Sequence, residues 1–200
     1  MRNLSSPDRV QRGKESRPTV LKMIRFVSLI CAALAFGLTV AHDLEIPGKE
    51  QLSGADWWTV QQTFYGGYAL VGGVAEVLGL ISTGLLAYLQ RARRTACILT
   101  MVAAISFAGM LALFAFGNNP LNQQVASWRP ETLPANWREI RNAWDGFHAA
   151  SSVLAALALI SLLTATLRET SASFVDRKGS QGVDHRKHRS ESAPQSQQVD

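Results

Sequence analysis

Four side chains that could act on a ligand share one stripe of the segment "NWREIRNAWDGFH", residues 136–148. Trp137, Arg141, Trp144 and His148 fall within roughly 60° of one another on a helix with about 100° per residue. A neutral imidazole near pH 7 is a general base for an acidic C–H or a phenol. A guanidinium can stabilise the resulting oxyanion, and indole rings can stack on an aromatic ligand. The stripe therefore predicts proton removal from an aromatic molecule, with His148 and Arg141 as catalytic residues.

Two further candidate residues, His42 and Glu45, lie at the same predicted side of the membrane as His148. His42 and Glu45 lie one helical turn apart just after the first apolar stretch, and His148 directly precedes the last one. Two histidines and a carboxylate could bind a metal ion, but the His-x-x-Glu spacing is frequent by chance. Hydrogen-bonded histidines at a membrane interface are the commoner explanation. We therefore predict no metal and no cofactor, with His42 and Glu45 as ligand-binding residues.

Four apolar stretches must position these side chains: residues 26–41, 66–89, 96–116 and 149–167. A helix needs about 20 apolar residues to cross the hydrocarbon core, and the stretches contain 16, 24, 21 and 19 residues. A soluble bundle would show a polar stripe along each helix, and these stretches show almost none. The sequence therefore predicts an all-α, integral membrane four-helix bundle with polar outer loops. The first stretch could instead be a secretion signal cleaved after Ala41.

Glu76 stands midway along the second apolar stretch. Its helical face otherwise carries small or polar residues, among them Gly72, Gly79 and Thr83. Small residues let neighbouring helices approach closely, so this face should point into the bundle. A carboxylate at the bilayer centre is costly unless it is paired, hydrated or protonated. We therefore expect Glu76 to be either a ligand-binding residue or a protonated acid bonded to a neighbouring helix.

Basic residues predict the orientation of the bundle. Sixteen of the 20 Lys and Arg residues lie before residue 26, in "RARR" between the second and third stretches, or after residue 167. The loops 42–65 and 117–148 hold the other four. Because cytoplasmic segments carry the excess of basic residues, both termini should lie in the cytoplasm and both long loops outside the cell membrane. The net charge of +5 then reflects topology and contact with membrane lipid rather than a nucleic-acid partner.

The tryptophans allow two interpretations. All five lie in the two long loops. Amphipathic rings collect in the headgroup layer of membranes, so these residues could form a simple anchoring belt. A belt is expected on both faces of the membrane, whereas the predicted topology places these tryptophans on one face. This asymmetry favours a lined pocket.

The two ends of the chain are polar. Residues 1–22 and 171–200 lack apolar periodicity and are rich in charged residues, Ser and Gln, a composition typical of disorder. We therefore predict one membrane domain over residues 23–170 between two disordered tails. Within this domain "IPGK" and "NNP" should form turns, and Ser53 and Asn136 should cap helices.

Four segments together resemble the anthrone oxygenase-like family of membrane proteins, over about residues 24–167: "AHDLEIPGK", "WWTVQQTFYGGY", "NNPLN" and "NWREIRNAWDGFH". The resemblance implies a four-helix membrane bundle and, as in some members, cofactor-free oxidation of polycyclic anthrones to quinones. It also implies a polar pattern, which falls here at Asn119, Asn122, Trp137, Arg141, Trp144 and His148. Where many members carry another basic residue one turn after the histidine, this chain has Ser151 and Ser152.

The function that we expect is an outward-facing pocket for an apolar aromatic small molecule in a small multi-pass membrane protein, with oxygenase-like chemistry. Its ligand-binding residues are predicted to be Trp137, Trp144, Asn119, Asn122, His42, Glu45 and Glu76. The alternative is a non-catalytic accessory subunit whose loops form a protein interface. A proton-coupled carrier that uses Glu76 is a weaker alternative, because four spans make a small transporter unless the protein is a homo-oligomer.

Overall fold

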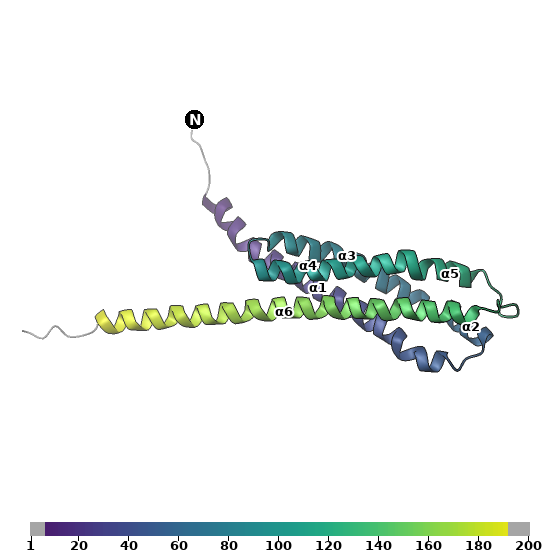
Figure 1. The fold of residues 1–200 in the computed structure, drawn as a ribbon. Helices are drawn as coiled ribbons and strands as arrows, with labels where there is room; N and C mark the ends of the chain where they lie inside the picture. The colour runs from purple at the N-terminus through teal and green to yellow at the C-terminus, as the bar shows by residue number, and fades with distance from the viewer. Residues whose placement is uncertain (1–6, 192–200) are drawn as a thin grey trace, which may run out of the picture.

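The structure is a computed structural model that describes residues 7–191. Every regular element in this part of the chain is a helix. The elements are α1 (Pro7–Lys49), α2 (Gly54–Phe64), α3 (Gly66–Leu89), α4 (Arg94–Leu113), the π-helix η1 (Phe114–Asn118), α5 (Asn119–Ala126) and α6 (Trp137–Glu191). The long helices α1, α3, α4 and α6 form a bundle in which α1 and α4 each pack against both α3 and α6 (Figure 1).

Four stretches of helix are long and apolar enough to cross a membrane. They are Thr19–Lys49, Gly66–Leu89, Arg94–Ala126 and Trp137–Thr170. The prediction of an all-α, four-helix membrane bundle is therefore confirmed. Three of the stretches extend beyond the apolar runs that the sequence suggested, because polar residues continue these helices past the length that hydrocarbon requires.

The distribution of side chains over the bundle fits a lipid environment. Large apolar residues such as Leu70, Ile105 and Val153 are exposed on its outside. Hydroxyl groups lie between the helices instead, and the Ser28 hydroxyl donates to Ser82 Oγ across the α1–α3 interface at 3.0 Å. A water-soluble core would show the reverse arrangement. Lipid tails are as apolar as these side chains, so no hydrophobic force drives them inward.

Small residues allow the helices to approach one another closely. Ala32, Ala103 and Ala158 have no exposed surface. At Gly79 an added Cβ would lie 2.3 Å from Phe107 Cε1. The Phe107 ring of α4 therefore packs directly on the backbone of α3, in the space that a side chain at position 79 would need. Gly79 and its neighbour Thr83 are buried, so at this level α3 turns its small and hydroxyl face into the bundle.

Two segments that the sequence suggested as turns are helical. In "IPGK", α1 continues through Pro47 to Lys49, although proline inside a helix removes the hydrogen bond to the carbonyl four residues earlier and its ring crowds that carbonyl. In "NNP", α4 passes through η1 directly into α5. Pro120 occupies one of the first positions of α5, where a missing N–H costs little.

The predicted helix starts agree with the structure. The Ser53 side chain caps α2 and accepts a hydrogen bond from the Asp56 N–H at 3.2 Å. Asn136 directly precedes α6, and its carbonyl accepts from the backbone N–H of Glu139 at 3.0 Å. The last helix therefore starts at the stretch that carries the predicted stripe.

Helices α1 and α6 also extend over residues 7–22 and 171–191, where the sequence suggested disorder. These ends project from the bundle (Figure 1). A helix that has already formed can add residues without a new nucleation step, and the disorder suggested for these ends stays a prediction. The remaining parts of the predicted tails, residues 1–6 and 192–200, lie outside the described residues.

The bundle has two chemically different ends. At the end near the termini, Glu169 on α6 pairs with Arg25 on α1 and lies 3.7 Å from Arg93 in the α3–α4 connection. These ion pairs tie three parts of the bundle together. We call the opposite end, which carries α2, α5 and residues 127–136, the capped end. It holds the side chains that the sequence singled out.

Candidate functional site

Side chains from α1 and α6 meet at the capped end. His42, Glu45 and Lys49 occupy positions i, i+3 and i+7 of α1, and Trp144 and His148 occupy positions i and i+4 of α6. Each set therefore lies on one helical face. Because α1 and α6 pack against one another, the two faces form a joint cluster in which the end of one helix meets the beginning of the other.

The two histidines are in direct ring contact. The centroids of the His42 and His148 rings are 4.3 Å apart, and the Trp144 ring lies 4.1 Å from His148. Tyr65, between α2 and α3, and Tyr68 on α3 lie 4.6 and 4.9 Å from His42 by the same measure. The Nδ1 atoms of both histidines are buried without a hydrogen-bond partner. The cluster thus holds two unused imidazole nitrogens inside an aromatic enclosure.

A buried lysine links a carboxylate of α1 to one of α6. Lys49 is 4% exposed, and its Nζ lies 3.5 Å from Glu45 Oε2 and 3.6 Å from Asp145 Oδ1. A buried ammonium persists only beside compensating charge, which the two carboxylates provide. The Nζ atom makes no hydrogen bond in the described part of the chain. It is therefore available as a donor to a bound molecule.

The Glu45 carboxylate lies close to Tyr65, His42 and Lys49. Its Oε2 accepts a 2.6 Å hydrogen bond from Tyr65 Oη and lies 3.7 Å from His42 Nδ1. Burial, together with the hydrogen bond to Glu45, raises the pKa of the Tyr65 phenol. Tyr65 therefore stays protonated at neutral pH and holds the Glu45 carboxylate in place as a permanent donor.

Arg141 lies outside the pocket lining and contacts the last turn of α1. Its guanidinium lies 5.6 Å from the centre of the Trp137 ring, donates to the Lys49 carbonyl at 3.5 Å and donates to Asn142 Oδ1 at 3.1 Å. A cation is favourable near the free carbonyls at the end of a helix. Arg141 thus fixes the last turn of α1 and the lysine on it. The catalytic role that the sequence suggests for Arg141 stays a prediction.

Two asparagines hold the Trp144 residue. The indole N–H donates to Asn122 Oδ1 at 2.8 Å, and the Trp144 carbonyl accepts from Asn118 Nδ2 at 3.1 Å. The sequence pointed to Asn119 and Asn122. Since this segment is helical, adjacent side chains point about 100° apart, and Asn118 rather than Asn119 reaches α6.

Two other predicted residues lie apart from the cluster. Trp137 packs on Trp57 of α2 in a separate apolar layer, with ring centroids 5.9 Å apart. Glu76 is half-buried on α3 and makes no hydrogen bond or ion pair in the described part of the chain. It stands eight residues, about 12 Å of helix, from Tyr68. Neither residue belongs to the histidine cluster.

A pocket of about 470 Å³ opens beside the cluster. It is lined by Leu44, Glu45, Gly48, Lys49, Leu52, Val60, Phe64, Tyr65 and Tyr68. Glu45, Lys49 and Tyr65 supply its polar groups, whereas Leu44 and Phe64, 76% and 66% exposed, give it an apolar mouth. Among the residues singled out from the sequence, Glu45 lines this pocket, and the histidines and Trp144 lie behind it.

The site contains residues that sequence reasoning missed. Lys49, Tyr65, Tyr68 and Asp145 were not proposed. The turn that the sequence predicts at "IPGK" separates Lys49 from His42, whereas in a continuous helix its position seven residues after His42 places it on the same face. The tyrosines carried no comparable spacing signal, because they lie on the far side of a connection whose path the sequence does not specify.

Among residues 19–170, whose side chains the structure describes, no three His, Cys, Asp or Glu side chains are arranged to hold a metal ion. Comparisons of the chain with protein-family models, with curated proteins and with solved structures find no match. The chemistry of the site must therefore be inferred from its own geometry.

Proposed function

We propose that the capped end binds an apolar aromatic small molecule that carries a phenolic or carbonyl oxygen, and acts on it in an oxygenase-like reaction. One observation carries the proposal: the buried Lys49 amino group, without a hydrogen-bond partner, lines a pocket beside Glu45 and the Tyr65 phenol. Leu44, Phe64 and Tyr68 suit a planar ring system, and the polar groups suit its oxygen atom. Such pockets are typical of small-molecule sites.

The arrangement supports proton removal followed by reaction with dioxygen. Glu45 takes a proton from an acidic C–H of the ligand, and His42, with Nδ1 3.7 Å away, is the next proton acceptor. The Lys49 ammonium stabilises the oxyanion into which the negative charge delocalises. Dioxygen is the second substrate and is reduced by the electron-rich anion. Overall, one CH2 group and one O2 give one carbonyl group and one water.

The resemblance of the sequence to the anthrone oxygenase-like family favours an anthrone-type substrate. The geometry changes the roles that the sequence suggested within that chemistry. His148 does not line the pocket, so we assign the base to Glu45 and place His148 behind His42 as a supporting residue. Arg141 keeps Lys49 in position, and Lys49 takes over the stabilisation of the oxyanion.

Ligand retention tests the proposal directly. Native mass spectrometry of the detergent-purified protein, after addition of anthrone, should show a one-to-one adduct. Gly48 lines the pocket and an added Cβ there meets no atom within 4 Å, so Gly48→Leu should fill the pocket without disturbing the fold and abolish the adduct. Gly146 on α6 is equally open but does not line the pocket, so Gly146→Leu should keep it. If the wild-type protein forms no adduct, the accessory-subunit interpretation is favoured.

We also propose that the capped end faces outward and that both termini lie in the cytoplasm, as the distribution of basic residues favours. With Cys31 and Cys97 replaced by alanine, the exposed positions 62, 92 and 131 can report the orientation. Gln62→Cys and Glu131→Cys should react with a membrane-impermeant maleimide on intact cells. Ala92→Cys should react only after permeabilisation, and its labelling on intact cells would reverse the orientation.

A further inference from the structure

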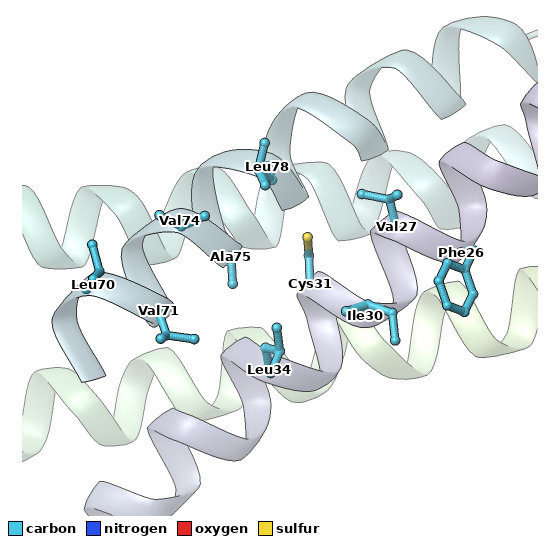
Figure 2. A pocket seen from close by; sticks show the side chains of 10 residues that line it. All are labelled: Phe26, Val27, Ile30, Cys31, Leu34, Leu70, Val71, Val74, Ala75 and Leu78. Atoms are coloured by element: carbon cyan, nitrogen blue, oxygen red, sulfur yellow. The ribbon is translucent and has the colours of Figure 1, made fainter. Parts of the chain in front are cut away.

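A second, wholly apolar groove runs along the outside of α1 and α3. It has a volume of about 380 Å³ and is formed by α1 from Phe26 to Leu34 and by α3 from Leu70 to Leu78. Figure 2 shows side chains from both helices on the two sides of this groove, including Cys31 and Ala75. The groove presents no charged side chain, so its natural occupant is an uncharged molecule from the bilayer.

The groove lies between α1 and α3, and the pocket is lined by α1, α2 and the beginning of α3. On α3 the groove reaches Leu70 and the pocket begins at Tyr68. On α1 the groove reaches Leu34 and the pocket begins at Leu44. The two cavities are therefore close on α3, whereas on α1 the ten-residue step from Leu34 to Leu44 separates them by about 15 Å of helix.

Leu38 is on the stretch of α1 that separates the two cavities. Leu38 stands one helical turn after Leu34 and seven residues before Glu45, on the same face of α1. Its Cδ1 lies 3.7 Å from the place that a Cβ on Gly72 would take, so the leucine lies over the bare backbone of α3. At nearby Gly37 and Gly73 an added Cβ meets no atom within 4 Å. Leu38 is therefore the side chain that contacts the glycine surface of α3 at Gly72.

We propose that the groove is the membrane-side access route to the pocket, and that it admits lipid-soluble, uncharged hydroxylated aromatic molecules past Leu38. This inference rests on the proposed ligand-binding function and adds the route and the physical class of the ligand. Two observations support it independently of the glycines. The pocket contains the buried Lys49 ammonium, which is ion-paired but donates no hydrogen bond within the described part of the chain, and its exposed residues Leu44 and Phe64 are apolar, as suits an opening toward lipid.

Binding kinetics in vesicles test the route. Protein in phosphatidylcholine vesicles is mixed with vesicles preloaded with 2-hydroxyanthracene, and quenching of tryptophan fluorescence is followed, since Trp144 lies beside Tyr65 of the pocket. Gly72→Ile places bulk against Leu38 and should slow quenching about tenfold with little change in its final amplitude. Leu38→Ala should accelerate quenching. Gly84→Ile adds the same bulk to α3 at an exposed position that meets no atom within 4 Å and should behave as wild type.

The outcomes separate the two proposals. If the wild-type protein binds the probe but Gly72→Ile and Leu38→Ala leave the rate unchanged, the groove is merely covered by lipid or by another copy of the chain. The access route is then overturned, while the pocket stands. If the wild-type protein shows no saturable quenching, the proposed ligand-binding function fails, and the route fails with it.

Discussion

Replacement of Lys49 by methionine should lower the free energy of unfolding by about 3–5 kcal/mol, because it removes one partner of a buried ionic cluster. The ammonium of Lys49 lies within 3.6 Å of carboxylates on both α1 and α6. Methionine retains most of the apolar stem, so the loss reports charge rather than packing. Unfolding of the protein in mixed micelles by increasing dodecyl sulfate, followed by far-ultraviolet circular dichroism, measures the change.

Two controls make this result interpretable. Asp145→Asn added to Lys49→Met removes the more buried of the two carboxylate charges that the lysine had compensated, and should restore most of the stability. Lys22→Met on the exposed surface of the same helix should leave unfolding unchanged. An unaltered unfolding curve for Lys49→Met would show that the ammonium does not hold α1 to α6. The restored double variant should fold but retain no ligand, which separates the structural from the binding role of Lys49.

The fold could be predicted from the sequence because the bilayer imposes strong constraints. Four apolar stretches of suitable length leave few alternatives to a helical bundle. The packing of small residues was visible in the same way, as at Gly79. What the sequence did not predict was the extent of the helices at the capped end. Proline and asparagine signals predict turns at "IPGK" and "NNP", but the adjoining helices continue through both. Pro120 stands at the start of α5, where a missing N–H costs little, whereas α1 continues through Pro47 despite the lost hydrogen bond.

Those helix ends decide which residues form the site. With α1 continuous to Lys49, the lysine stands on the same face as His42 and Glu45, and the pocket moves from α6 to the side of α1 and α3. The stripe on α6 correctly indicated the face of this helix that is buried, since Trp137, Arg141 and Trp144 are buried. The four residues of the stripe contact different parts of the molecule, however. Which residues each side chain contacts depends on how the helices pack against one another, and the spacing within one helix does not specify this packing.

Glu45→Gln should lower the rate of anthrone oxidation by about 10²–10⁴-fold, the usual contribution of a general base. Glutamine keeps an oxygen that can accept the hydrogen bond from Tyr65, so the pocket should stay intact and anthrone should still bind. It cannot take up a proton, so the chemical step alone is lost. The rate is followed as quinone absorbance in air-saturated vesicles. Spontaneous oxidation is subtracted by means of the pocket-filling Gly48→Leu variant.

A matched pair of variants decides which residue is the base. Glu50→Gln changes an exposed carboxylate close to Glu45 in the chain, outside the pocket lining, and should oxidise anthrone at the wild-type rate. His148→Ala removes a ring that packs on His42 but does not line the pocket, so its effect should be smaller than that of Glu45→Gln. Suppose instead that Glu45→Gln turns over normally and His148→Ala is inactive. The imidazole on α6 is then the base, the ligand must reach behind the described pocket, and the role of Lys49 reduces to holding α1 against α6.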